Sequence, residues 1–462
     1  MSSETTVDEV PQSIRRLETT LAQARATDDA QKVAEALLAL GKAFLESGNV
    51  PRALTQFEEG IELAEAPAWA AQFWGYKGLC LRRLGNTHFA QIALYKAHNL
   101  AKESGQSALM LDTLLQLGSL QASIGQPEKA VNKFEQALSL ALDRGDQVRA
   151  MHAAGRAASV FVGLGAHKKA LEYYAQALEK AKTVGQPRAV ATYYLHLGNL
   201  YLAEDETAMA IEQFQQAVEA AAVGQEQPGE RVATTFAALA GLMRAHAAAG
   251  ERQAALLYGE HALRLAKENG DTTSQLSALN MLATALLDWE EEEKALAYLQ
   301  RGAELARELD DWNWQLSFLA QAGFAAYRTG DGEQALSHYE AALEMATRVQ
   351  DRPAEARLLG RLGAVYADMG RLPDAVETAQ QALTLAQELD EAGLLEDRGL
   401  LGEQQIMLAF SHADLQQPTV AAEYARAAAS TFAEAGDEAM EEKAQRLLAT
   451  VLEGEEQTTQ VS

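Results

Sequence analysis

Residues 125–138 read GQPEKAVNKFEQAL, and the phrase returns with other polar residues as GAHKKALEYYAQAL at 165–178 and GDGEQALSHYEAAL at 330–343. The glycine, the alanines and one aromatic residue keep their places. The first alanine of the phrase recurs along the chain at Ala53, Ala90, Ala130, Ala170, Ala210, Ala255, Ala295, Ala335, Ala375 and Ala421. Most steps between these marker alanines are 40 residues long. A fixed period of this length predicts a solenoid of stacked units.

Each marker alanine belongs to a pattern with helical spacing. A second small residue follows seven positions later, as Ala137 follows Ala130, and several units have an aromatic residue four positions later. These offsets share one helical face, where small side chains let helices approach and rings fill the space between them. A second helical pattern precedes each marker, most clearly at 193–210, and glycines such as Gly125 suit the turn between the two helices. The sequence therefore predicts an all-α fold, an α-solenoid of antiparallel helix pairs.

The acidic composition of the chain restricts which kinds of partner it is expected to bind. The chain has 39 basic and 65 acidic residues, a formal net charge of −26. Phosphates would be repelled by such a chain unless it formed a basic stripe, so nucleic acid and anionic membrane are not expected partners. The single cysteine, Cys80, rules out an intrachain disulfide and fits a reducing compartment. The first residues lack the basic start and apolar core of a secretory signal, so a cytoplasmic location is expected.

The first helix of several units contains Leu-Gly followed by large apolar residues, as in LALGKAF at 38–44 and LHLGNLY at 195–201. With the turn and the marker alanine, these residues resemble the tetratricopeptide repeat over about 34–432, in ten units. The familiar period of that family is 34 residues, whereas most steps here are 40. The usual proline that closes the second helix is also absent. The chain is therefore similar to the long-helix repeats of kinesin light chains, spindle-orientation adaptors and sensor domains of bacterial regulators.

The resemblance implies one continuous right-handed superhelix over 12–453, about ten repeats with a capping helix at each end. Residues 1–11 are expected to be a flexible N-terminus and 454–462 a disordered acidic tail. Two inserts, at 223–231 and 390–402, break the period of the repeat. They are either longer surface loops or contact loops and hinges.

Motifs for chemistry are missing from the sequence. It contains no phosphate-binding G-x-x-x-x-G-K-[ST] loop, no H-E-x-x-H motif and no G-x-S-x-G motif. The nine histidines are scattered over the units without close pairing. We therefore expect a protein that is not an enzyme and that has no catalytic residues, no metal site and no cofactor.

The resemblance also implies where a ligand would bind, because the first helices of such repeats line a concave groove. We number each first helix so that its small marker residue takes position 8, and positions 2, 5, 9, 12 and 13 then face inward. The candidate contact residues at these positions are Arg82, Arg83, His152, Asn199, Arg244, Asn280, Phe324, Tyr327, Arg328, Arg357 and Phe410. Aromatic residues and arginine are common at interface hot spots, and asparagine amides can bond a peptide backbone.

Two interpretations of this groove remain open. Its small central side chains would admit a peptide or helix, or they would pack against the protein's own helices. The first interpretation predicts a non-catalytic scaffold or adaptor that binds a peptide or helix of a partner protein. The alternative is a regulatory sensor whose superhelix changes curvature when it binds a small peptide or effector. Self-association through the end repeats is a further possibility.

Overall fold

The computed structural model describes residues 12–27, 29–223, 228–395 and 397–461, without the side chains of Pro228 and of residues 454–461. These residues form 22 helices and no strand, which confirms the predicted all-α class. The chain divides into two compact units, Met1–Ala249 (unit 1) and Gly250–Ser462 (unit 2), each of which is described by itself. The single continuous superhelix remains a prediction, and the flexible N-terminus predicted at 1–11 lies outside the described residues.

Unit 1 contains twelve of the described helices. Their bounds are α1 Gln12–Ala26, α2 Ala30–Glu46, α3 Val50–Leu63, α4 Pro67–Arg83, α5 Thr87–Glu103, α6 Ser107–Ser123, α7 Pro127–Asp143, α8 Gln147–Gly163, α9 His167–Val184, α10 Pro187–Ala203, α11 Thr207–Val223 and α12 Pro228–Ala248.

Unit 2 contains the other ten. Their bounds are α13 Arg252–Glu268, α14 Thr272–Asp288, α15 Glu292–Glu308, α16 Trp312–Arg328, α17 Gly332–Val349, α18 Arg352–Asp368, α19 Leu372–Glu391, α20 Gly399–Asp414, α21 Pro418–Ala435 and α22 Glu438–Val461.

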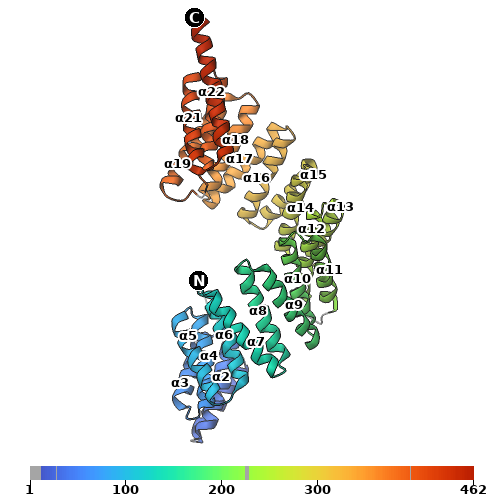
Figure 1. The fold of residues 1–462 in the computed structure, drawn as a ribbon, viewed down its shortest axis with the longest axis vertical. Coiled ribbons are helices and arrows are strands. Elements are labelled where there is room, and N and C mark those ends of the chain that lie inside the picture. The colour runs from blue at the N-terminus through green and yellow to red at the C-terminus, as the bar shows by residue number, and fades with distance from the viewer. Residues whose placement is uncertain (1–11, 28, 224–227, 396, 462) are drawn as a thin grey trace, which may run out of the picture. The chain divides into compact units, whose positions relative to one another are not determined.

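Within each unit the helices stack in chain order (Figure 1). Even-numbered helices from α2 to α20 are the first helices of the repeats, and α1 and α22 lie where the capping helices are predicted. First helices also contact first helices of the next repeat, as α4 contacts α6, α6 contacts α8 and α18 contacts α20. One face of each unit is therefore built from first helices. Helix α22 continues through 454–461, where the sequence predicts a disordered tail.

The seam between the helices is made by the residues of the repeated phrase. All ten marker alanines are completely buried. The aromatic residues four positions later are also buried, and Phe134 is 2% exposed. Its ring lies against Gly118 of the preceding first helix, where an added Cβ would be 2.6 Å from ring atom Cε1. The predicted role of the phrase is confirmed: glycine leaves the space that the ring fills, and burying such a ring contributes about 1.5–3 kcal/mol.

Many of the helices end at a residue whose backbone is in the left-handed conformation, and this residue is not always glycine. Gly125 has a φ of 71° between α6 and α7, as the sequence predicts. In the equivalent turn after α10 the residue is Asp205, with a φ of 59°. Between repeats, after α17, Gln350 has a φ of 61° and takes the place that Gly185 has after α9. The backbone of both residues is in the left-handed region, which costs a non-glycine residue about 1–2 kcal/mol.

Replacement of Gln350 by glycine is therefore expected to stabilise unit 2 by up to about 1 kcal/mol, after the larger unfolded-state entropy of glycine is subtracted. Gln350 is exposed and follows α17 directly. Chemical denaturation of the full chain measures the change. The reverse exchange, Gly185→Gln at the end of α9, is the control and should destabilise unit 1. A destabilised Gln350→Gly variant would contradict the prediction.

Candidate functional site

The first-helix face of unit 1 contains a cavity of about 660 Å³. Gln72 and Tyr76 of α4, Asp112 of α6, and His152 and Arg156 of α8 line it. The short loop between α5 and α6 closes one edge. Because α4, α6 and α8 are successive first helices, the cavity lies on the face where the sequence predicts a groove.

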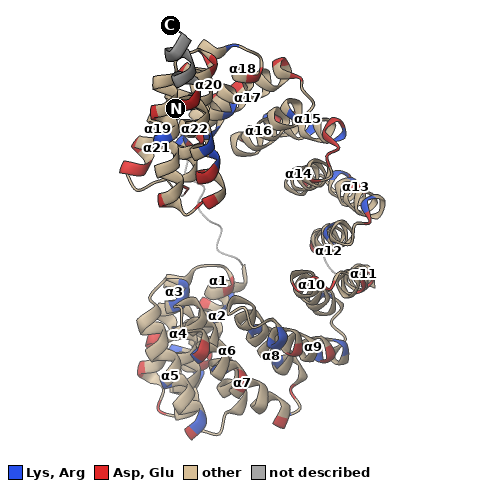
Figure 2. Ribbon diagram, turned by 45° about the horizontal axis from the view of Figure 1, so that its top comes forward, with Lys and Arg blue, Asp and Glu red and all other residues tan. Residues whose placement is uncertain are grey.

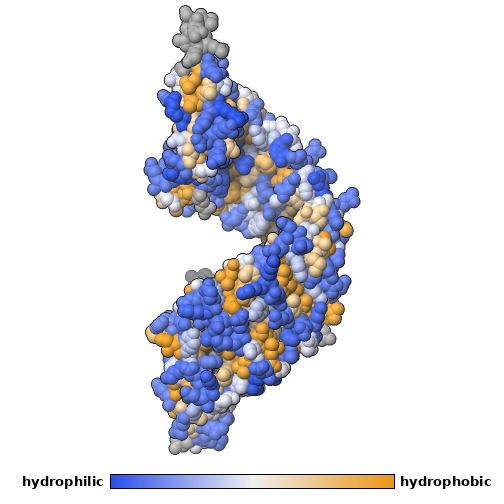
Figure 3. Space-filling model, in the orientation of Figure 1, coloured by the Kyte–Doolittle hydropathy of each residue, from blue (hydrophilic) through white to orange (hydrophobic). Residues whose placement is uncertain are grey.

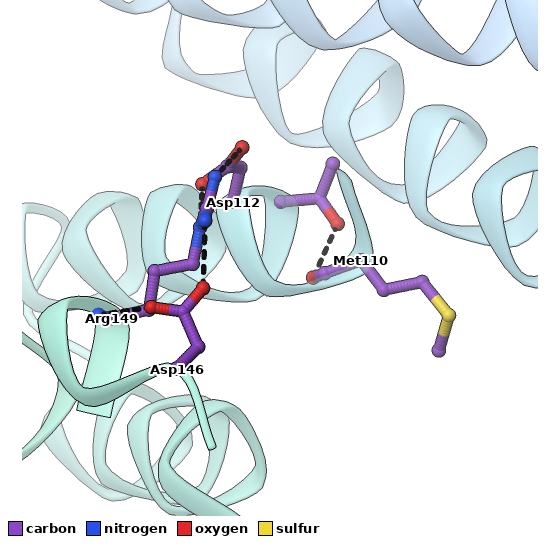
Figure 4. A network of polar contacts seen from close by, with 5 residues as sticks. Met110, Asp112, Asp146 and Arg149 are labelled. Atoms are coloured by element: carbon purple, nitrogen blue, oxygen red, sulfur yellow. Dashed lines mark hydrogen bonds and ion pairs between the residues drawn. The ribbon is translucent and has the colours of Figure 1, made fainter. Parts of the chain in front are cut away.

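Asp112 is held by an ion-pair network (Figure 4). The Arg149 guanidinium donates to both carboxylate oxygens of Asp112, at 2.7 and 3.0 Å, and to Asp146 at 2.8 Å. Asp146 also accepts from the backbone N–H of Arg149 and caps α8, and this hydrogen bond lowers the pKa of its carboxyl group. The network joins α6 to α8 and neutralises the charge of Asp112 in the cavity.

Two further arginines at this face have no such partner. Among the described residues no ion pair joins Arg82 or Arg156 to a carboxylate, although Arg156 donates to the hydroxyl of Ser119. Burial lowers the pKa of both guanidinium groups, and the charge of Arg156 lowers the pKa of Arg82 further. Burial followed by Arg156 and Arg149 lowers the pKa of His152. Helix α8 contains basic residues and no acidic one (Figure 2), so this face is locally positive in an acidic chain.

Other predicted contact residues of unit 1 bond to neighbouring repeats. The Arg83 guanidinium donates to the carbonyl oxygen of Leu45 at 3.0 Å, which ties α4 to α2. Arg244 of α12 donates to the side-chain oxygen of Asn199 of α10 at 2.8 Å. This bond uses one of the two lone pairs of the Asn199 oxygen, which reduces what the side chain can accept from a ligand.

The first-helix face of unit 2 contains two cavities that adjoin at α18. One of about 550 Å³ lies between α16 and α18, and one of about 820 Å³ lies between α18 and α20. Arg357 and Arg361 line both. Phe324 lines the smaller cavity, and Phe410, whose side chain is 42% exposed, lines the larger. The structure thus places three residues of the predicted groove, Phe324, Arg357 and Phe410, in the linings of adjoining cavities.

Three of the remaining predicted residues of unit 2 have intramolecular partners. The side-chain oxygen of Asn280 accepts from Gln321 at 2.8 Å. The Tyr327 hydroxyl donates to Asp368 at 2.5 Å, which together with burial raises the pKa of Tyr327 to about 12. Arg328 pairs with two glutamates of the preceding repeat, at 3.3 and 2.9 Å. The bonds of Asn280 and Tyr327 join successive first helices, and those of Arg328 join α16 to the turn before α15 and to α15 itself. All of them reduce what the side chains can offer a ligand.

Arg156 and Arg361 are cavity residues that the chosen groove positions omit. Both take position 6 of their helices. Positions 2, 6, 9 and 13 recur at alternating steps of four and three, which is the stripe that one helical face presents. Including position 6 in the pattern would have found both arginines from the sequence.

The described residues show no other chemical centre. No group of three or more His, Cys, Asp or Glu side chains is gathered there as a metal would require. None of the described helices is long and apolar enough to cross a membrane. On the faces visible in Figure 3, hydrophobic side chains are interspersed with hydrophilic ones in each unit.

The change in the stability of unit 1 with pH should arise in part from His98. Burial, followed by Lys133 and Lys102, lowers its pKa from 6.5, and its Nδ1 bonds the Thr113 hydroxyl at 3.0 Å. The unfolded chain takes up this proton first as the pH falls, so stability is lost below about pH 6.5. A His98→Gln variant can retain the hydrogen bond without titrating. Its melting temperature should fall less between pH 7.5 and 5.5 than that of the wild type; an equal fall would contradict the assignment.

The helices form antiparallel pairs, and the first helices of successive pairs together build one face that contains cavities. These features define a helical-repeat protein of the solenoid class. The family profile described as tetratricopeptide repeat matches residues 69–143, 149–222 and 315–388, and a second profile with the same description matches 9–68 and 38–97. Together these segments cover more than half of the sequence. The chain belongs to the tetratricopeptide repeat family, as the motifs predict.

Solved structures with a similar fold include the apo form of the quorum sensor NprR from B. thuringiensis, at 13% identity and a TM-score of 0.46, covering 80% of this chain and 99% of that one. The apo form of RapI has 14% identity and a TM-score of 0.43, with 61% and 99% covered. The C-terminal part of a repeat protein from Cytophaga hutchinsonii has 17% identity and a TM-score of 0.44, with 58% and 95% covered. A search of curated proteins found no match.

Proposed function

We propose that the protein is a non-catalytic scaffold or adaptor that binds a peptide or helix of a partner protein on its first-helix face. The adjoining cavities of unit 2 are the observation that supports this proposal most directly. Across three successive first helices they combine exposed aromatic surface with Arg357, which has no ion-pair partner among the described residues. Aromatic and arginine side chains in a depression are the residue types that dominate binding energy in interfaces.

Site-specific photocrosslinking tests the binding face. A photoreactive amino acid is placed at Phe410 on the first-helix face and, as a matched control, at Gln381 on the exposed side of α19. Crosslinks to a partner protein should form from position 410 and not from position 381, and an Arg357→Gln substitution should reduce them. Equal crosslinking from both positions would reject the groove as the binding face.

A regulatory sensor is the second candidate, and unit 1 favours it. Arg82 and Arg156 repel each other at the first-helix face, and an anionic effector placed between them would relieve this repulsion. Such an effector would favour the spacing of α4 and α8 that suits it, which is how a ligand shifts a conformational population. Hydrogen exchange in α4–α8 should then slow when candidate acidic peptides bind. Saturating binding without any change in exchange would exclude this mechanism.

The partner class and location rest on the sequence. The net charge of −26 favours a protein partner over nucleic acid or an anionic membrane. A cytoplasmic location is proposed because the sequence has a single cysteine, Cys80, which cannot form an intrachain disulfide and fits a reducing compartment. Association of the chain with itself through the end repeats is a separate proposal, which sedimentation at several protein concentrations tests.

A further inference from the structure

Helix α5 has an exposed apolar stripe on the second-helix face of unit 1, which is the face built from the odd-numbered helices. Phe89 is 63% exposed and Ile92 is 50% exposed. Lys96 is also exposed, and its spacing of four residues from Ile92 places it on the same helical stripe. The neighbouring second helices have polar residues at the first two places: Arg52 and Thr55 in α3, and Lys129 and Asn132 in α7. The repeat therefore does not require apolar residues on this face of α5.

Lysines surround this stripe. Lys129 and Lys133 of α7 line a cavity together with Tyr95 of α5, which lies one turn from Ile92. Among the described residues no ion pair joins Lys96, Lys129 or Lys133 to a carboxylate. The three positive charges are therefore available to an acidic ligand.

The carboxylates around these lysines are fewer or already engaged. Glu58 and Glu59 of α3 form ion pairs with a lysine of α4 and an arginine of α1. Glu135 of α7 accepts from the hydroxyl of Tyr173 at 2.7 Å. Glu128, which lines the cavity, has no ion pair in the part of the chain that the structure describes. Three unpaired lysines thus lie beside one unpaired carboxylate, so this surface is positive in a chain whose net charge is −26.

The cavity between α5 and α7 has a volume of about 310 Å³ and contains an unsatisfied acceptor. Gln121 of α6, which is 1% exposed, lines it. The amide nitrogen of Gln121 donates to the Tyr95 hydroxyl at 3.1 Å, whereas its carbonyl oxygen has no hydrogen-bond partner. A buried acceptor without a donor is unfavourable, and an N–H or O–H group that enters the cavity would satisfy it. The surface therefore suits a segment that is acidic, partly apolar and equipped with donors.

The C-terminal end of the chain has this chemistry. Helix α22 has 24 residues, whereas α20 and α21 beside it have 16 and 18, and its end projects past α21 (Figure 1). Val451 packs in the core of unit 2, and Leu452, which follows it, is 39% exposed. The sequence from Leu452 onward, LEGEEQTTQVS, has three glutamates and no basic residue, followed by glutamine and threonine, which carry donors.

We propose that the end of α22, residues 452–461, docks on the exposed stripe of α5 and the lysines of α7 in a second copy of this chain. Leu452 packs on Phe89 and Ile92, and the glutamates pair with the lysines. Since each copy has both surfaces, the contact is heterologous and either adds further copies or closes into a ring. It extends the proposed self-association, because one of its two surfaces lies within unit 1 rather than in an end repeat.

Sedimentation velocity of the full chain over a range of protein concentrations tests the contact. The average mass should rise with concentration and fall when salt is added, because salt screens exposed ion pairs. Reversing two lysines, Lys129→Glu with Lys133→Glu, should raise the dissociation constant about 10-fold, and so should Glu455→Lys with Glu456→Lys. Chains with all four reversals should associate again, because the reversed charges still pair. Phe89→Ser should weaken association without altering any charge.

A matched control reverses two lysines of another second helix. Lys168 and Lys169 are also exposed at the start of a second helix, α9, and their replacement by glutamate should leave association unchanged. Circular dichroism should show that every variant is folded. A photoreactive amino acid at Ile92 should crosslink to the end of α22, and in a mixture of isotope-labelled and unlabelled chains the crosslink should join the two kinds.

Several results would overturn the inference. These are a monomer at every concentration, crosslinks confined to one chain, no recovery with all four reversals, or an equal loss of association in the α9 control. Association that persists unchanged in the Phe89→Ser and lysine variants would also reject this contact, and would leave association through the end repeats standing. Partner crosslinks from position 410 on the first-helix face are independent of all these outcomes, so the scaffold proposal is tested separately.

Discussion

Replacement of Phe214 by alanine is expected to destabilise unit 1 by about 3–5 kcal/mol, the largest stability effect predicted for this chain. The ring is completely buried on α11 between two glycines, Gly198 of α10 and Gly241 of α12. A Cβ added at either glycine would lie 2.7 or 2.5 Å from Phe214 Cε1. Since neither glycine has a side chain that can move into the vacated space, the cavity should persist.

Chemical denaturation followed by circular dichroism measures this loss, and hydrogen exchange locates it. Repeat proteins are stabilised by contacts between neighbours, so exchange should accelerate most in α10–α12. Phe410→Ala is a matched control because it removes the same side chain from an exposed site. If both variants lost the same stability, the ring of Phe214 would not be the contact that joins these helices.

Replacement of Gly302 by alanine is expected to destabilise unit 2, although alanine is the better helix former. Gly302 lies within α15, where alanine would gain about 1 kcal/mol from helix propensity. A Cβ at this position would be 2.4 Å from Cε1 of Phe318, which is completely buried on α16. Moving a packed ring costs about 1–3 kcal/mol, so the contact outweighs the propensity.

Two further variants isolate the contact. Gly163→Ala in α8, where no atom lies within 4 Å of an added Cβ, should be neutral or stabilising. Combining Gly302→Ala with Phe318→Leu should recover part of the loss, because the smaller side chain makes room for the methyl group. Denaturation midpoints of the four proteins are sufficient for the comparison. Stabilisation by Gly302→Ala alone would show that α15 and α16 separate more easily than their packing implies.

The repeat architecture could be predicted from particular residues. Every marker alanine proved to be buried, and Gly125 and Gly165 adopt the left-handed conformation expected of them. The prediction succeeded because the period, the small residues and the turns all specify the same helix pair, repeated ten times. The non-glycine turn residues, such as Asp205, were not predicted, because an aspartate by itself disfavours the left-handed conformation. The packing of the two helices that the turn connects overrides this preference.

The candidate site was predicted less completely. The register identified Phe324, Arg357 and Phe410, which line adjoining cavities. It could not show that Asn199 and Asn280 are bonded to neighbouring repeats, because their partners lie 45 and 41 residues away. It also left out Arg156 and Arg361, which follow the helical stripe at position 6.

The sequence by itself determined the class of fold, the number of repeats and the residues of the seam, because these depend on local spacing within each helix pair. Only the tertiary structure decided which polar side chains of the first-helix face remain free for a ligand. Hydrogen bonds between successive first helices join residues from different repeats, so no local pattern specifies them. Contacts of this kind between repeats occupy Tyr327 and Arg328, whereas no ion pair joins Arg357 to a carboxylate among the described residues.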